Sequence, residues 1–248
     1  ILCRFILNGF DSREVREKIN TSHKFVISKT SSQIRMVLFA ELMSLCEFPH
    51  ENTFIIWEKE SHSAFLIDPG DEPDRVISKI KTLDLDPVAI INTHAHLDHV
   101  GAVSKIKDEF SIPFYLHKDE KQILEHYPEM CRMFGIKPYE IPSVDHWISG
   151  DGEINFDNFK VTFLETPGHT PGGTTYMIDG HCFSGDTLFS GSIGRTDLPG
   201  GNFTTLMNSL GKLKNKLNHD WVIHPGHGPN TSMRHELKHN PFLDSFNN

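Results

Sequence analysis

The sequence contains no long apolar segment. The best candidate, residues 36–46, is shorter than the roughly 18–20 residues that a membrane-spanning helix needs, and it contains Glu41. The start of the chain also lacks the charged, apolar and small-residue regions of a secretory signal. From these two absences we expect a cytoplasmic protein without a membrane partner.

Cysteine is also scarce. The 4 cysteines are far apart in the 248-residue chain and form no C-x-x-C pair: Cys3, Cys46, Cys131 and Cys182. A chain of this length buries enough core to fold without disulfides. We therefore expect reduced thiols, as is usual in the cytosol.

Positive charge is in deficit, with 24 Lys and Arg against 33 Asp and Glu and a formal net charge of −9. This balance excludes the broad basic face that a nucleic-acid partner favours. Residues 1–35 carry seven of the basic and three of the acidic residues, a net of +4, so the remainder carries −13. That segment has weak periodicity, a Ser/Thr patch at 30–32 and a first residue other than Met. We predict that residues 1–35 are a poorly ordered or non-native N-terminal extension and that 36–248 form one domain.

Strands and helices are interspersed beyond residue 43. A short apolar run at 88–92 is typical of a buried strand, and apolar residues spaced by three and four over 203–217 predict an amphipathic helix. This succession predicts an α+β protein with two packed sheets and outer helices. The predicted strands are 45–48, 53–57, 64–67, 88–92, 113–116, 153–156, 160–165, 174–178, 182–184 and 221–224, and the helices 73–83, 102–110, 118–127 and 203–217.

Four potential metal ligands lie within six residues, directly after the predicted strand at 88–92: His94, His96, Asp98 and His99. In extended backbone, residues two apart point the same way, so His94 and His96 can face one ion. Asp98 and His99 begin the next turn and can face a second ion. Imidazole and carboxylate ligands together suit zinc, iron or manganese.

Three further strand ends run into glycine-rich turns that each present one ligand-type residue. These are His169 in the turn 165–173, Asp186 in 183–187 and His227 in 224–228. Glycine permits the close backbone approach that such a loop needs. Each turn alone is a weak signal, but their succession in one chain favours a metal site. His224, three residues before His227, we interpret as structural.

These ordered motifs resemble the metallo-β-lactamase superfamily in its two-metal form, over residues 51–243. Within it, 166–173, 192–201 and 224–229 resemble the glyoxalase II-like hydrolases. Only 21 residues follow His227, whereas glyoxalase II carries a helical C-terminal domain, so we expect the short single-domain group. The resemblance implies a four-layer αββα sandwich and two bridged metal sites: His94, His96 and His169 for the first ion, Asp98, His99 and His227 for the second, and Asp186 between them.

Seven ligands exceed the about four that one tetrahedral zinc takes. We therefore predict two divalent ions, zinc in the first place, with iron or manganese as alternatives. The predicted reaction is attack of a metal-bridging hydroxide on a small-molecule thioester, for example one linked to glutathione. Asp98 is the predicted catalytic residue, since it can both bind the second ion and move the proton of the nucleophile.

Arg195 is a predicted substrate-binding residue, because its planar guanidinium suits a carboxylate of the substrate. The equal alternative is a pair with Asp197 that shapes the loop. Two alternatives to the hydrolase stay open. A one-iron persulfide dioxygenase needs only two histidines and a carboxylate, and a lactonase or β-lactamase could use the same scaffold. The acyl group, the thiol carrier and the oligomeric state are not predicted.

Overall fold

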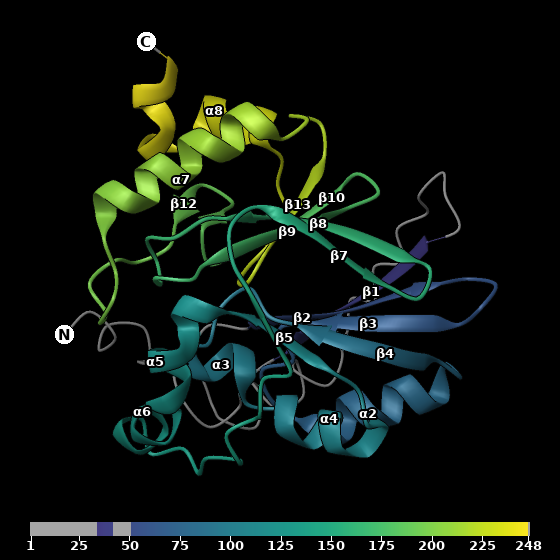
Figure 1. Ribbon diagram of the computed structural model, residues 1–248. Helices are drawn as coiled ribbons and strands as arrows, with labels where there is room; N and C mark the ends of the chain where they lie inside the picture. Colours follow the sequence, from purple (N-terminus) through teal and green to yellow (C-terminus); the bar gives the residue numbers. More distant parts are fainter. Residues whose placement is uncertain (1–33, 42–50, 248) are drawn as a thin grey trace, which may run out of the picture.

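The computed structural model describes residues 34–41 and 51–247 (Figure 1). The predicted strand 45–48 lies outside the described residues. So does the predicted extension of residues 1–35, apart from its last two residues, which begin strand β1. Both therefore stay predictions.

Two sheets pack face to face. The first has the order β1-β2-β3-β4-β5-β6, antiparallel from β1 to β3 and parallel from β3 to β6. Its strands are β1 (Ile34–Glu41), β2 (Glu51–Glu58), β3 (Ser63–Ile67), β4 (Asp86–Ile91), β5 (Phe114–His117) and β6 (His146–Ile148). The second has the order β13-β10-β9-β8-β7, in which only β13 and β10 are parallel. Its strands are β7 (Gly152–Phe156), β8 (Phe159–Glu165), β9 (Thr174–Ile178), β10 (His181–Gly185) and β13 (Val222–Pro225).

Helices cover the outer face of each sheet, as Figure 1 shows. The first sheet is covered by α2 (Pro73–Thr82), α3 (Leu97–Val100), α4 (Val103–Phe110), η2 (Lys118–Glu120), α5 (Lys121–Glu125) and α6 (Tyr127–Met133). The second is covered by α7 (Phe203–Lys216), α8 (Met233–His239) and η3 (Pro241–Asn247). A small hairpin, β11 (Leu188–Phe189) and β12 (Ser192–Ile193), follows β10. The predicted α+β class and αββα sandwich are confirmed.

Among the described residues, the buried apolar side chains divide into three cores that match these layers. In β4, Ile90 packs with the helices of the first sheet, whereas Ala89 and Ile91 face the second sheet. This alternation follows from the two-residue period of a strand, and it explains why a strand buried on both faces is a continuous apolar run. On the far side, Leu206, Leu210 and Leu213 of α7 pack on the second sheet.

The segment 118–127 differs from its prediction as one helix. It forms η2 and α5, and a new helix, α6, begins at Tyr127 and continues to Met133. Pro128 lies in the first turn of α6, where its missing N–H costs no hydrogen bond. The proline therefore lies in the first turn of a new helix, at the point where the predicted helix 118–127 ended.

In the described part of the chain, no helix has both the length and the apolar composition needed to cross a membrane.

Two buried histidines connect β10 and β13. His181 Nδ1 lies 2.8 Å from His224 Nε2, and His224 Nδ1 lies 3.0 Å from Asn230 Oδ1. Since a carbonyl oxygen only accepts, His224 donates through Nδ1 and accepts from His181 through Nε2. Burial, and then His181, lowers the pKa of His224 to about 3. Burial also lowers the pKa of His181. The pair is neutral at pH 7, in keeping with a structural role for His224.

We expect the pH dependence of stability to become shallower in acid when His224 is replaced by glutamine. The unfolded chain binds a proton at this histidine near pH 6.5, but the folded chain does so only near pH 3. The contribution of His224 to the free energy of unfolding is thus complete above pH 6.5. It falls by about 1.4 kcal/mol per pH unit as the pH decreases toward 3. Urea unfolding between about pH 4.5 and 7 measures the difference.

The exposed His235 of α8 provides a matched control for this experiment. His235→Gln also removes one histidine, and it should keep the pH dependence of the wild-type protein. If His224→Gln lost stability in acid as steeply as wild type does, the neutral pair would not be the cause.

Candidate metal centre

The seven predicted ligands come from four loops that meet at one edge of the sandwich. The loop after β4 carries His94 and His96, and it leads into α3, which carries Asp98 and His99; the loops after β8, β10 and β13 carry His169, Asp186 and His227. Backbone hydrogen bonds join these loops: the Thr174 N–H donates to the Thr93 carbonyl at 2.9 Å, and the Gly226 N–H to the Gly185 carbonyl at 2.9 Å. Residues up to 133 positions apart in the chain therefore lie together.

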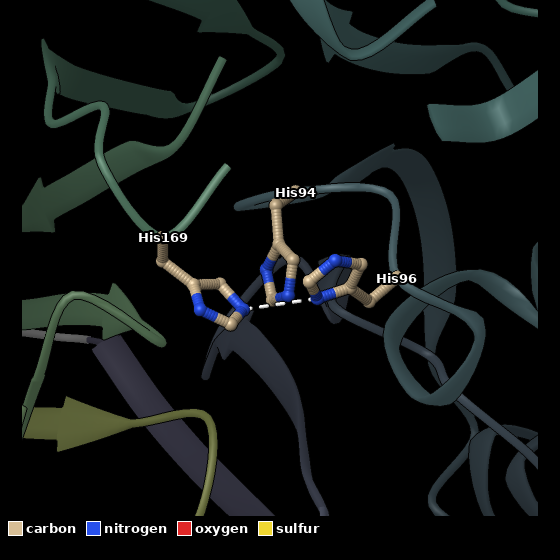
Figure 2. Close-up of side chains that lie close together, drawn as sticks. All are labelled: His94, His96 and His169. Carbon is tan, nitrogen blue, oxygen red and sulfur yellow. Dashed lines mark hydrogen bonds between the residues drawn. The ribbon is translucent and has the colours of Figure 1, made fainter. Parts of the chain in front are cut away.

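Three histidines form the first set: His94, His96 and His169. One potential ligand atom from each lies within 4.8 Å of the others. The His96 Nδ1 and His169 Nε2 atoms are 2.9 Å apart. Figure 2 shows the three imidazole rings turned toward one another, two from the loop after β4 and one from the loop after β8. A single ion can contact all three rings.

Asp98, His99 and His227 form the second set, again with ligand atoms within 4.8 Å of one another. His227 Nε2 lies 3.3 Å from Asp98 Oδ2. Asn52 of β2 holds the loop that carries His227: its side-chain amide donates to the carbonyls of Pro225 at 3.0 Å and Gly228 at 2.9 Å.

Asp186 lies between the two sets. Its Oδ2 is 3.4 Å from His169 Nε2 of the first set and 3.6 Å from His227 Nε2 of the second. Its Oδ1 is 3.5 Å from His99 Nε2. Gly226 permits this position, because a Cβ there would lie 2.3 Å from Asp186 Oδ1.

Each of three histidines has its outer ring nitrogen engaged by a fixed partner. The Nδ1 atoms of His94, His99 and His169 lie 3.0 Å from Thr93 Oγ1, 3.1 Å from Asp68 Oδ2 and 2.8 Å from the Arg195 carbonyl, respectively. These bonds determine the tautomer and direct each Nε2 inward, as outer partners of metal-bound histidines do.

Asp68 is a residue of this site that the sequence analysis does not single out; it directly follows the predicted strand 64–67. Its Oδ1 accepts the Thr93 N–H at 2.7 Å, and its Oδ2 accepts the Thr93 hydroxyl at 2.6 Å. It thus holds both His99 and the residue before His94. The available signal was its position, because a carboxylate directly after a buried strand has the same form as the other ligand turns.

Three buried atoms facing this site have no hydrogen-bond partner among the described residues: His94 Nε2, His99 Nε2 and Asp186 Oδ1. Buried polar atoms are nearly always paired, and a bound cation satisfies two imidazole nitrogens and a carboxylate at once. Imidazole and carboxylate donors are those that divalent zinc, iron and manganese use. The residues present therefore fit a divalent metal centre.

The protonation states of His94 and His96 suit metal binding. Burial and nearby histidines lower the pKa of His94 well below its ordinary value, and burial and His169 lower that of His96 to about 4. Both rings are neutral at pH 7, as a metal ligand must be. Burial raises the pKa of Asp98, but the charges of His99 and His227 outweigh it and bring the value to about 2. Asp98 is therefore ionised.

The side chain of Arg195 pairs with Asp197. Its Nε and Nη2 atoms both lie 2.7 Å from the Asp197 carboxylate, and both side chains are exposed. A substrate carboxylate would have to displace Asp197 from this edge of the guanidinium. The contact of Arg195 with the first set is made by its backbone carbonyl, which any residue provides. Its predicted role in substrate binding stays a prediction.

We expect Arg195→Ala to raise KM for an anionic thioester by less than about threefold, since an exposed ion pair contributes little. Steady-state kinetics with one anionic and one neutral thioester measure the effect. An increase of KM of about tenfold for the anionic substrate alone would instead assign the guanidinium to substrate binding.

A family model described as the metallo-beta-lactamase superfamily matches residues 48–227, which include all seven predicted ligands. The hydroxyacylglutathione hydrolase GloC of Haemophilus influenzae is 39% identical over 199 residues, covering 79% of this chain and 93% of that protein. The crystal structure of the BLEG-1 B3 metallo-beta-lactamase has a TM-score of 0.76 and 34% identity, covering 84% of this chain and 99% of that one.

A second solved structure, of a protein in a di-iron-bound form, has a TM-score of 0.71 and 37% identity, and it covers 79% of this chain and 100% of that one. The family match extends over most of the sandwich and over every loop of the centre. Sequence, fold and site geometry thus agree, and the chain belongs to the metallo-β-lactamase superfamily.

Proposed function

We propose that this protein is a two-metal hydrolase that cleaves a small-molecule thioester of the hydroxyacylglutathione type. The observation that carries the proposal is the position of Asp186, whose carboxylate lies within 3.6 Å of imidazole nitrogens from both sets. A carboxylate between two ligand sets is the arrangement that bridges a pair of ions. The 39% identity to the hydroxyacylglutathione hydrolase GloC supports the thioester substrate.

The first set would hold one ion and the second set the other, with Asp186 shared between them. Two divalent ions there would supply Lewis acidity and lower the pKa of a bound water from about 15.7 to about 7. The chain itself supplies an ionised carboxylate, Asp98, at the same place. As an acceptor it would orient the attacking water and take its proton.

No cysteine of the described residues is suited to act as the nucleophile. Cys131 and Cys182 are buried, and burial raises the pKa of both thiols. Neither forms the thiolate that nucleophilic attack requires at neutral pH. Water is therefore the proposed nucleophile.

We propose zinc as the metal, although the same donors suit iron and manganese, and a similar protein was solved in a di-iron-bound form. A one-iron dioxygenase would need two histidines and one carboxylate. That chemistry would leave Asp98, His99 and His227 without a role, although they converge within 4.8 Å. With two ions, each of the seven predicted ligands would have a role. A glutathione-linked substrate also agrees with the cytoplasmic location that the sequence predicts.

Metal analysis of the purified protein together with three assays tests this function. We expect two metal ions per chain and release of thiol from S-lactoylglutathione, with no oxygen uptake. A single iron with oxygen uptake on a persulfide would contradict the proposal. Hydrolysis of a β-lactam or a lactone in place of the thioester would retain the metal centre but overturn the substrate.

A further inference from the structure

One buried carboxylate joins the two loops that carry the first set. Glu120 Oε2 accepts the N–H of Ala95 at 2.8 Å, and its Oε1 accepts the N–H of Gly172 at 2.7 Å. Ala95 lies between His94 and His96, and Gly172 is three residues after His169. These two hydrogen bonds therefore connect the loop after β4 to the loop after β8.

We infer that Glu120 is a positioning residue: it sets the separation of the loops after β4 and β8, and so the geometry in which the first set meets a metal ion. The inference rests on the proposed metal-dependent function. Glu120 acts through backbone amides, because both of its oxygens are engaged by N–H groups and neither bonds to an imidazole.

The packing around Glu120 leaves it little freedom. Its side chain is fully buried, with 0% exposure. The second loop approaches it closely at Gly172, where a Cβ would lie 2.7 Å from His117 Nδ1, 2.9 Å from Glu120 Cγ and 3.0 Å from the Glu120 backbone nitrogen. A residue with a side chain at this point would push the loop and the carboxylate apart.

The short helix η2, which carries Glu120, is connected to both sheets through His117. This helix directly follows β5 of the first sheet. His117, at the end of β5, accepts the Asp119 N–H through Nδ1 at 3.2 Å. Through Nε2 it donates to Glu165 Oε1, at the end of β8, at 2.7 Å. Glu120 therefore has a fixed position, and its two hydrogen bonds place the loops after β4 and β8 relative to each other.

A carboxylate suits this task better than an amide of the same size. Two oxygens can accept from two N–H groups that approach from different loops, whereas glutamine offers one oxygen and places an NH₂ donor against the second N–H. Glu120→Gln therefore releases one loop without removing volume. Outer-shell changes of this kind typically weaken metal binding by about 10–100-fold.

The test is a titration of the metal-free full chain with Co²⁺ in the presence of a competing chelator. For Glu120→Gln we expect the affinity for the first ion to fall by about tenfold or more, with a changed visible spectrum of the bound Co²⁺. In the metal-free chain, the ¹⁵N amide resonances of Ala95 and Gly172 should shift. An unchanged affinity and spectrum would overturn the inference.

Glu236 provides the matched control. It is also 0% exposed, and its Oε2 accepts the Gly191 N–H and the Asn240 side-chain amide, each at 2.8 Å, away from the first set. Glu236→Gln should lower the melting temperature about as much as Glu120→Gln does. It should leave the affinity for the first ion within about threefold of wild type. An equal loss of affinity in both variants would mean that burial of a glutamate, not its position, is responsible.

Gly172→Ala tests the same contact from the other loop, and it serves if Glu120→Gln does not fold. The added Cβ should lower the affinity for the first ion in the same direction, and wild-type affinity in this variant would contradict the inference. These measurements use only Co²⁺, so their outcome does not depend on which substrate the protein cleaves. A wild-type protein that binds metal but does not cleave S-lactoylglutathione would refute the proposed function without affecting the role of Glu120.

Discussion

Replacing Asp186 by asparagine is expected to lower kcat by about 10³-fold or more, which corresponds to about 4 kcal/mol in the activation barrier. Asp186 lies within 3.6 Å of nitrogens from both sets, so its charge and its two oxygens would serve both of the proposed ions. Asparagine keeps the shape but carries no charge and only one acceptor oxygen. The metal content should fall from two ions toward one, since the first set already offers three imidazoles and needs the bridge least.

Steady-state kinetics and metal analysis on the same preparation measure this result. Asp157→Asn is the matched control, because Asp157 is exposed in the turn between β7 and β8 and has a φ of 48°, which asparagine tolerates. That variant should retain both ions and wild-type kcat. An Asp186→Asn enzyme with two ions and undiminished turnover would show that no bridging carboxylate is needed.

Asp98→Asn should fold normally but lose turnover by about 10²–10⁴-fold, the range that a positioned general base contributes. The wild-type carboxylate is ionised at every pH near neutrality, because His99 and His227 bring its pKa to about 2 in spite of burial. An amide can neither take a proton nor carry this charge. The readouts are kcat, metal content and circular dichroism.

Metal content separates the two predicted roles of Asp98. A variant with two ions and a low kcat assigns the residue to proton transfer. A variant with one ion assigns it to binding of the second ion, in the set where Asp98 Oδ2 lies 3.3 Å from His227 Nε2. Near-wild-type kcat with two ions bound would contradict both.

Much of this protein is predictable from local pattern. The buried strand β4 is a continuous apolar run, and α7 has apolar residues at helical spacing, so both were predicted to within a few residues. The ligands after β4 are recognisable because four of them lie within six residues. His169, Asp186 and His227 are recognisable because each follows a strand and lies in a glycine-rich turn.

Other features depend on contacts that no local pattern contains. Asp68 bonds to His99, 31 residues later, and Glu120 to Gly172, 52 residues later. The Arg195 side chain pairs with Asp197 at 2.7 Å, a contact that the sequence offered only as one of two alternatives. In each case a polar group of ordinary sequence context gained its role from the residue that packing brought to it.

The seven predicted ligands and the strands that precede them are recognisable from the sequence, because they follow from side-chain chemistry and from the two-residue period of a strand. The tertiary structure decided which ligands face each other, which nitrogen of each histidine points inward, and which buried carboxylates hold the loops. These depend on how two sheets pack and on atoms many residues apart, so only the folded chain contains them. The histidines are recognisable in the sequence, whereas the contacts of Asp68 with His99 and of Glu120 with the backbone of Ala95 exist only in the fold.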